Sequence, residues 1–386
     1  ALAEMERLYK LVNSACEEDE IVLIRARSEL VKLQSGDAKN LAIWHEMIEL
    51  SRHQFDEIYG RLGVDFDETL GESFYNDRLK GIVDELAAQG IAEESDGAQV
   101  VFFNNHKSLK KNPAIVQKSD GAANYTTTDL ATLEHRQNSW QPSEVIYVTD
   151  GRQQLHFQQL FELYNRWKPS HGMKLNHVWF GAILGEDGRP FKTRSGEIIR
   201  LSGLLDEAEQ RAFDAVSEKN PDISGDERRE IARIVGIGAI KYADISGNRQ
   251  SDYVFNWDTM LALVGNTAPY LLYAFTRIRS IFRKLGDESL TRPESFALAQ
   301  PEELTLAKHL LRFGLVLELV IDECRPNYLC NYLYELAGHF ASFYENCPVL
   351  KTEGDIRTQR LALCDLTGQV LNTGLETLGL ETTERM

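Results

Sequence analysis

The sequence predicts an α/β part that is followed by an all-α part. Two short apolar runs, residues 145–148 and 177–184, have the length of buried strands, and a helical pattern lies between them. Strands that alternate with helices are typical of a parallel sheet with crossover connections. From residue 201 onward the apolar residues recur almost throughout at helical spacing, which predicts a bundle of antiparallel helices.

The first ninety residues are predicted to be mostly helical. Apolar residues recur near a 3.6-residue period over residues 4–33, and the Ser-Gly-Asp run at residues 35–37 interrupts the pattern. A second helix follows and is expected to end at Gly60 and Gly63. A third helix is expected over about residues 76–89.

The β-type pattern begins near Ala98. Residues 100–103 and 114–116 are short β-type runs, and they precede the two buried strands at 145–148 and 177–184. Only part of a parallel sheet is visible in these runs. The sequence therefore predicts an incomplete sheet, with an exposed strand edge and an uncovered apolar face.

The helical part shows both end signals and apolar stripes. A helix is expected to begin near Leu201, and residues 224–227 (Ser-Gly-Asp-Glu) form a plausible capping box before the next helix. The boundary with the mixed part is expected around Gly247 to Gly265. Two stripes predict bundle helices: Leu304, Ala307, Leu311 and Leu315, and then Leu329, Leu333, Leu336, Phe340 and Phe343.

Composition excludes several classes of protein. The 386 residues carry 42 Lys and Arg against 59 Asp and Glu, a net charge of −17, which argues against a general coater of nucleic acid. No apolar run approaches the roughly 20 residues of a membrane helix, and the charged first residues do not resemble a secretory signal. The five cysteines form no CxxC pair. We therefore expect a reduced, soluble, cytoplasmic protein.

A glycine-punctuated loop at residues 185–196 follows the second buried strand. Open parallel sheets bind ligands at the carboxyl ends of their strands, and Lys192 and Arg194 there could neutralise phosphate charge in a transition state. The alternative is a solvated hairpin with a few charges, which composition alone favours.

Two further segments carry residues that could bind a substrate. Tyr125 and Asp129 lie four residues apart, so in a helix they share a face, and a carboxylate beside a phenol suits a guanidinium. The alternative makes Thr126 an N-cap and Asp129 its capping-box partner, and local sequence does not separate the two. Gln153 follows a strand and could hold a substrate by its amide, whereas His156 is more often a packed residue. The nine histidines show no metal-ligand spacing, so we assign no metal site.

The segment from Asn266 onward interleaves arginines with aromatic residues. Such a helix suits a stacked, single-stranded nucleic acid, and its basic cluster could attract phosphates despite the acidic chain. A packed aromatic face with a solvated basic face is an equal alternative. The basic cluster consists of Arg277, Arg279, Arg283 and Lys284.

Several of these stretches closely resemble the class I arginyl-tRNA synthetases of bacterial type. The loop GRPFKTRSG at residues 188–196 is similar to a degenerate form of the family's KMSKS loop. The other matching stretches are ELVKLQSGD at 29–37, GESFYND at 71–77, KSDG at 118–121, TTDLA at 127–131, LHF at 155–157, YAD at 242–244, SDY at 251–253, GNTAPY at 265–270 and ERM at 384–386.

The resemblance implies a fold, a reaction and partners. The fold would be a partial class I nucleotide-binding (Rossmann-like) parallel sheet with a helical insertion, followed by an α-helical anticodon-binding bundle. The domains would be residues 1–97 (insertion), 98–247 (second half of the catalytic domain) and 248–386 (bundle). The reaction would be the ATP-dependent activation of arginine and its transfer to tRNA(Arg), with Mg²⁺ accompanying ATP and no prosthetic group. A cytoplasmic monomer without a membrane partner is expected.

The resemblance also assigns residues to roles. It implies that Lys192 and Arg194 act catalytically on the closing loop. The expected binding residues are Tyr125, Asp129 and Gln153 for arginine, His156, Gly181 and Lys192 for ATP, and Asn266, Arg277, Arg279 and Arg283 for tRNA.

Two departures from the family pattern stand out. The KMSKS-like loop has Ser195 where the second lysine is expected, and no HxGH sequence occurs in the chain. The family's N-terminal domain is missing as well. We therefore expect this sequence to be a C-terminal portion of a longer enzyme. The alternative is a non-catalytic, tRNA-binding or regulatory paralogue, which would lack the need for an arginine pocket.

Overall fold

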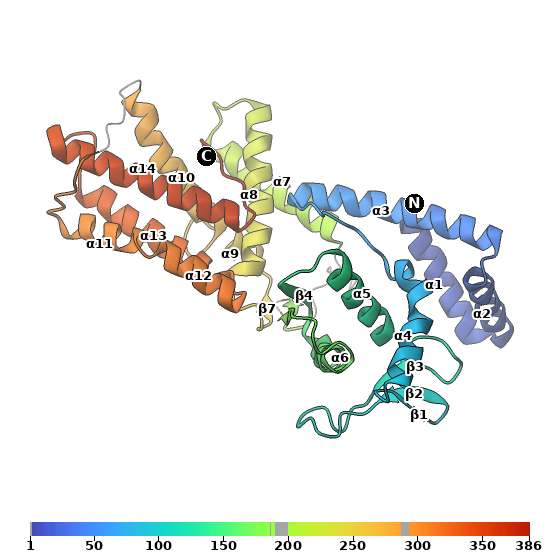
Figure 1. Ribbon diagram of the computed structural model, residues 1–386. Helices are drawn as coiled ribbons and strands as arrows, with labels where there is room; N and C mark the ends of the chain where they lie inside the picture. The colour runs from blue at the N-terminus through green and yellow to red at the C-terminus, as the bar shows by residue number, and fades with distance from the viewer. Residues whose placement is uncertain (1, 186, 190–199, 287–292) are drawn as a thin grey trace. The chain divides into compact units, whose positions relative to one another are not determined.

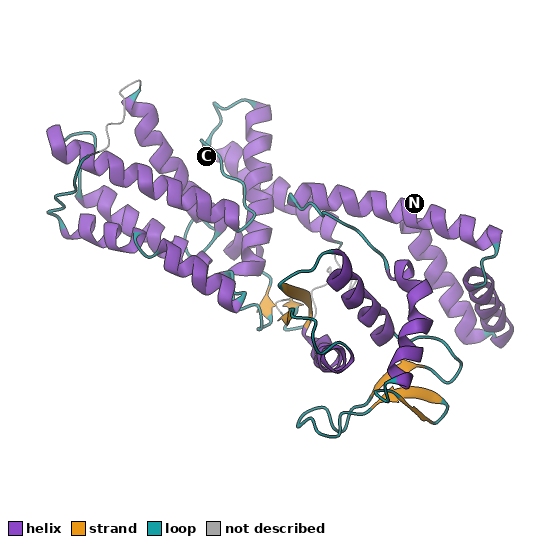
Figure 2. Ribbon diagram, in the orientation of Figure 1, coloured by secondary structure: helices purple, strands orange, loops and turns teal. Residues whose placement is uncertain are grey.

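The computed structural model describes residues 2–185, 187–189, 200–286 and 293–386. The chain forms two compact units, Ala1–Asp67 and Glu68–Met386, which are described separately (Figure 1). Helices predominate in both units (Figure 2).

The first unit contains three helices, α1 (Leu2–Glu18), α2 (Glu20–Gln34) and α3 (Ala38–Leu62). The single pattern predicted for 4–33 is divided because Asp19 caps α2, its carboxylate accepting a hydrogen bond from the Ile21 amide at 2.8 Å. Helix α3 runs through Gly60 and ends at Gly63, which adopts the left-handed conformation with φ 64°. The prediction that Gly60 ends the helix is therefore wrong, and that for Gly63 is confirmed.

The second unit begins with a small α/β layer. A short helix η1 (Glu72–Tyr75) leads into α4 (Asn76–Ala88), which the sequence predicted. The strands β1 (Glu93–Ser95), β2 (Ala98–Val101) and β3 (Ala114–Gln117) form an antiparallel sheet. The β-type runs near residues 100 and 114 are confirmed as strands, and their sheet is separate from the parallel one.

The predicted parallel pair follows with its crossover helix. It comprises β4 (Glu144–Asp150), the turn η2 (Gly151–Gln153), α6 (Gln154–Trp167) and β5 (Lys174–Phe180), with Asp150 opposite Phe180 in parallel register. Helices α5 (Tyr125–Ser139) and α6 share a hydrophobic core with α4, β2, β3 and β4. Ile146, Val148 and Phe180 remain exposed, as expected for a sheet of which only part is present.

The run predicted as one strand over 177–184 forms two strands. After β5 the chain turns at Gly181, and β6 (Ile183–Leu184) pairs in parallel with β7 (Tyr253–Val254). A Cβ atom on Gly181 would lie 2.7 Å from the backbone of Ser251. This close approach lets the two segments meet, and apolar periodicity alone does not reveal it.

The rest of the second unit is helical. One core unites α7 (Leu201–Lys219), α8 (Gly225–Ser246) and α10 (Ala268–Leu285) with the later helices, so α7 and α8 pack with the predicted bundle. The division at 97 and 247 stays a prediction. The remaining elements are α9 (Trp257–Met260), α11 (Pro301–Leu310), α12 (Phe313–Glu323), α13 (Asn327–Asn346) and α14 (Gly354–Thr377).

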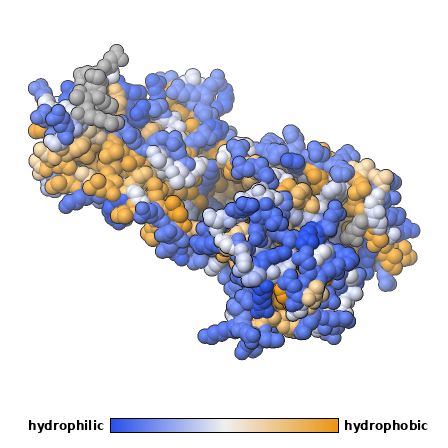
Figure 3. All heavy atoms as spheres, viewed as in Figure 1, coloured by the Kyte–Doolittle hydropathy of each residue, from blue (hydrophilic) through white to orange (hydrophobic). Residues whose placement is uncertain are grey.

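One predicted stripe is buried and the other is not. The α13 stripe, Leu329 to Phe343, is fully buried among α8, α10, α11, α12 and α14. The stripe from Leu304 to Leu315 does not form a single buried face, because the helix is interrupted between α11 and α12. Leu311 is 82% and Leu315 67% exposed. Figure 3 shows apolar side chains gathered on this face of the bundle.

No described helix combines the length and the apolar character that crossing a membrane requires.

Candidate functional site

The start of α5 places the predicted phenol and carboxylate together. Asn124 caps this helix, its side-chain oxygen accepting a hydrogen bond from the Tyr125 amide at 3.0 Å. Tyr125 and Asp129 therefore lie one helical turn apart on one face. The alternative in which Thr126 is the N-cap is wrong, because Thr126 is a buried residue inside the helix.

Asp129 of α5 is joined to His156 of α6. The two atoms Asp129 Oδ2 and His156 Nε2 lie 2.6 Å apart, and the Tyr125 ring meets the imidazole edge-on with centroids 4.8 Å apart. His156 is thus packed within the fold and is also bound to Asp129, which is predicted to bind the substrate arginine. Its Nδ1 is buried without a hydrogen-bond partner among the described residues. Tyr125 and Asp129, predicted as a pair, thus form one cluster with His156, which we call the Asp129 cluster.

Gln153 and Gly181 lie at the carboxyl ends of neighbouring strands. Gln153 belongs to the turn η2 directly after β4, and Gly181 follows β5. Because the two strands are parallel and adjacent, both residues lie at one edge of the sheet. A pocket beside this edge is lined by residues that include Val148, Phe180 and Gly181. Gln153 is predicted to bind arginine and Gly181 to bind ATP, and both roles stay predictions.

The loop residues Lys192 and Arg194 lie outside the described residues, as do most of the residues of the predicted closing loop.

Sequence reasoning missed Arg249, which joins the strand end to the bundle. Its Nη1 donates to the Trp179 carbonyl oxygen at 2.5 Å, and its Nε donates to the Cys324 carbonyl oxygen at 2.9 Å. The Gly181 amide in turn donates to the Arg249 carbonyl oxygen at 2.8 Å. Burial lowers the pKa of this guanidinium from its usual value. The only sequence signal was an arginine inside the stretch between the YAD and SDY motifs.

The basic cluster of α10 is divided between two environments. Thr267 caps the helix, its hydroxyl accepting a hydrogen bond from the Tyr270 amide. The Arg277 guanidinium lies over the rings of Tyr273 and Tyr344, at 5.6 and 5.3 Å from their centroids. Arg279 and Arg283 instead contact Glu384. The structure thus confirms the mixture of arginine with aromatic residues and adds a carboxylate that the sequence did not predict.

Arg279 and Arg283 bind two different groups of Glu384. The Arg279 Nε donates to the Glu384 carboxylate at 2.9 Å, and the Arg283 Nη1 donates to the Glu384 carbonyl oxygen at 2.5 Å. The Arg283 Nη1 is also 3.7 Å from a carboxylate oxygen of Glu384.

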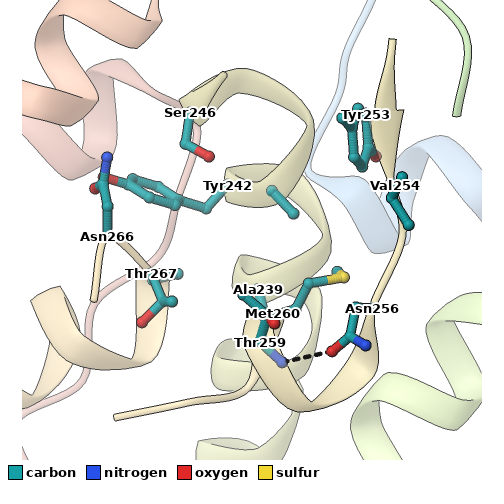
Figure 4. A pocket seen from close by; sticks show the side chains of 12 residues that line it. Ala239, Tyr242, Ser246, Tyr253, Val254, Asn256, Thr259, Met260, Asn266 and Thr267 are labelled. Carbon is teal, nitrogen blue, oxygen red and sulfur yellow. Dashed lines mark hydrogen bonds between the residues drawn. The ribbon is translucent and has the colours of Figure 1, made fainter. Parts of the chain in front are cut away.

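Asn266 lines a pocket formed by residues of α8, β7, α9 and the start of α10 (Figure 4). Its side-chain oxygen accepts a hydrogen bond from the Tyr242 hydroxyl at 2.6 Å, and its amide nitrogen donates to Asn331 at 3.0 Å. Burial raises the pKa of the Tyr242 hydroxyl, so it remains a hydrogen-bond donor at neutral pH. These bonds use the side chain of Asn266 within the fold, and its predicted contact with tRNA stays a prediction.

Among the residues that the structure covers, no three His, Cys, Asp or Glu side chains cluster as metal ligands.

Two family models match successive parts of the chain. One, described as tRNA synthetases class I (R), catalytic domain, matches residues 1–257. The other, described as DALR anticodon binding domain, matches residues 271–386. Together with the parallel strands and the helical bundle, these matches confirm the predicted fold class.

Curated relatives and solved structures agree with these matches. The arginine–tRNA ligase of Chromobacterium violaceum is 46% identical over all of this chain and 68% of its own length, and that of Idiomarina loihiensis is 45% identical over 67% of its length. The arginyl-tRNA synthetase structure from Plasmodium falciparum superposes with a TM-score of 0.81 at 30% identity, covering 95% of this chain and 62% of that one. The Thermus thermophilus structure shares the fold, with a TM-score of 0.77 at 24% identity over 92% and 68% of the two chains.

Proposed function

Because the chain belongs to the class I arginyl-tRNA synthetase family, we propose that its α/β part holds arginine and ATP and that its helical bundle holds tRNA(Arg). The reaction class is that of an arginine–tRNA ligase, as in the relatives of which the chain covers two thirds. The Asp129 cluster is the observation that carries the assignment of the arginine site.

We propose that Asp129 binds the guanidinium of arginine. His156 occupies the Oδ2 atom of this carboxylate at 2.6 Å and fixes its orientation, so that Oδ1 is available to a second donor. A guanidinium donates several N–H groups in one plane, and a charged pair of this kind is stronger than a neutral hydrogen bond. The Tyr125 hydroxyl is placed one turn away to accept or donate beside it. Gln153, at the strand end, would bind the polar end of the amino acid.

We propose that ATP binds at the carboxyl edge of β4 and β5. Gly181 lies at this edge, and the exposed apolar residues Val148 and Phe180 line the adjacent pocket, which suits an adenine ring. Lys192 and Arg194 would neutralise the phosphates, and Mg²⁺ would enter bound to those phosphates. The arginine carboxylate would displace pyrophosphate from the α-phosphate to give arginyl-adenylate, and a tRNA ribose hydroxyl would then displace AMP.

The bundle is proposed to bind the tRNA through Arg277, Arg279, Arg283 and Asn266. Arg277 with Tyr273 and Tyr344 forms a surface of cationic and aromatic groups on which an unpaired base can stack. We further propose that the protein acts as a monomer in the cytoplasm, where translation takes place.

The test is arginine-dependent exchange of pyrophosphate into ATP by the complete protein, with tRNA(Arg) present. Asp129→Asn removes the charge but keeps the shape, and should weaken arginine use about 10- to 100-fold while the KM for ATP stays constant. Asp214→Asn, on the outside of α7, is the matched control and should have no effect. Equal losses for arginine and ATP would refute the role of Asp129. A complete protein that binds tRNA(Arg) but shows no exchange would favour the non-catalytic alternative.

A further inference from the structure

Residues 378–386, which we call the closing segment, lie across α8 and α10 (Figure 1). The Arg233 guanidinium of α8 binds Glu381 with both terminal nitrogens, at 2.8 and 2.5 Å. Leu380 is buried in the bundle core, and the Thr382 hydroxyl donates to Asn372 at 2.7 Å. The segment is therefore anchored before it reaches α10.

On α10 the closing segment takes two of the arginines that are proposed to bind tRNA. Glu384 is shared by Arg279 and Arg283, whereas Arg277 has aromatic partners instead. A carboxylate and a phosphodiester both carry one negative charge on two equivalent oxygens, and both pair with a guanidinium in the same planar geometry. The Glu384 carboxylate thus presents the same chemistry as an RNA phosphate to Arg279, which is hydrogen-bonded to it, and to Arg283, whose Nη1 lies 3.7 Å from it and donates to the Glu384 carbonyl oxygen.

Exposure of the three side chains makes this contact exchangeable. Glu384 is 60% exposed, Arg279 39% and Arg283 37%, so water screens the attraction and little burial is lost on separation. The pair of Arg360 with Glu303 is the opposite case, because those side chains are only 9% and 6% exposed. Breaking that buried pair would leave an uncompensated charge in the core.

We propose that Glu384 and an RNA phosphate are alternative occupants of the Arg279 and Arg283 guanidiniums. When nucleic acid binds the basic side of α10, a phosphate replaces the Glu384 carboxylate, and the end of the closing segment moves off the helix. The buried Leu380 side chain and the bond from Thr382 to Asn372 retain the rest of the segment. This inference rests on the proposed binding of tRNA by the bundle.

The test is the affinity of the full chain for a tRNA(Arg) transcript at low salt. Glu384→Gln removes the competing charge and should raise the affinity about three- to five-fold. Glu381→Gln is the matched control, because it removes the same charge from the same segment but from Arg233 of α8, and it should leave the affinity unchanged. Glu384→Asp keeps the charge with a shorter reach and should give a smaller gain.

The combined variant Arg279→Gln/Arg283→Gln separates this inference from the proposed function. It should weaken tRNA binding, and Glu384→Gln should give no further gain in that background. If the double arginine variant binds tRNA like the wild type, the proposed interface itself is wrong. If it binds more weakly but Glu384→Gln alone gives no gain, or gives the same gain as Glu381→Gln, the exchange is refuted and the interface stands. Thermal unfolding of each variant checks that the bundle remains folded.

Discussion

Replacing Glu303 by Gln should destabilise the bundle more than any other single loss of a carboxylate in α11. The Arg360 Nε donates to Glu303 Oε1 at 2.7 Å, while Glu303 Oε2 accepts from the Ala299 and Gln300 amides at 3.0 Å each. A glutamine can still accept from the two amides, but it turns a neutral group toward the guanidinium. Because Arg360 would remain buried with the Pro348 carbonyl as its one hydrogen-bond partner among the described residues, we expect a loss of about 3 kcal/mol.

The loss of stability caused by Glu303→Gln should become smaller as the pH falls. Burial raises the pKa of Glu303, but the bonds from the Gln300 amide, Arg360 and the Ala299 amide outweigh burial, and the net pKa is lowered. A carboxyl whose pKa is lower in the folded chain stabilises the fold above its unfolded value of about 4.3, and this contribution is lost as the pH falls through the folded value. The difference between wild type and variant is therefore full at pH 7 and shrinks below about pH 4.

Urea unfolding followed by circular dichroism at pH 7 and at lower pH measures both effects. Glu302→Gln is the control, since this neighbouring carboxylate lies in the same first turn of α11, and it should change the unfolding free energy by less than about 0.5 kcal/mol. Replacing both Glu303 and Arg360 by Met should recover part of the loss, because no charge is then left unpaired. Equal stability of Glu303→Gln and Glu302→Gln at pH 7 would refute the reasoning.

Three further predictions concern the site and the interface. Gly181→Ala should cost at least about 2 kcal/mol of stability in thermal unfolding, because its Cβ would lie 2.7 Å from the Ser251 backbone. The control Gly247→Ala should be tolerated, because a Cβ there has open space. Equal effects of the two substitutions would contradict this account. Arg249→Met should destabilise the chain in the same assay, because the Trp179 and Cys324 carbonyls lose their donor, and unchanged stability would show that water replaces it without loss. Charge reversal at Arg277 and Arg283 together should weaken binding of a tRNA(Arg) transcript and make its affinity depend less on salt concentration. If this salt dependence is unchanged, the basic side of α10 does not bind the tRNA.

Local sequence patterns predicted where helices and strands occur better than they predicted which faces of these elements are buried. The α13 stripe was correct because one uninterrupted helix carries it and other helices surround it. The stripe from Leu304 to Leu315 has the same spacing, but a break at residues 311–312 turns the following helix, and spacing alone does not show the break. Likewise the apolar run at 177–184 gives no sign that Gly181 turns the chain.

Pairs that lie far apart in the sequence limited the prediction of the site. Tyr125 and Asp129 were found together because helical geometry relates residues four apart. The bond from His156 to Asp129 depends on the packing of α6 against α5, and that from Arg279 to Glu384 joins residues 105 positions apart. Contacts of this kind follow from tertiary packing, and a single sequence carries no local signal for them.

The guanidinium of Arg249 also determines which parts of the second unit are able to move independently. It is hydrogen-bonded both to Trp179, near the end of β5, and to Cys324, at the end of α12, so separating these two elements would break both bonds of a half-buried cation. Under the proposed function, one RNA molecule must reach both the strand edge, where the amino acid is activated, and the helices that hold its anticodon. A rigid connection through Arg249 would keep the distance between the strand edge and these helices constant, while the exposed contacts at either end form and break.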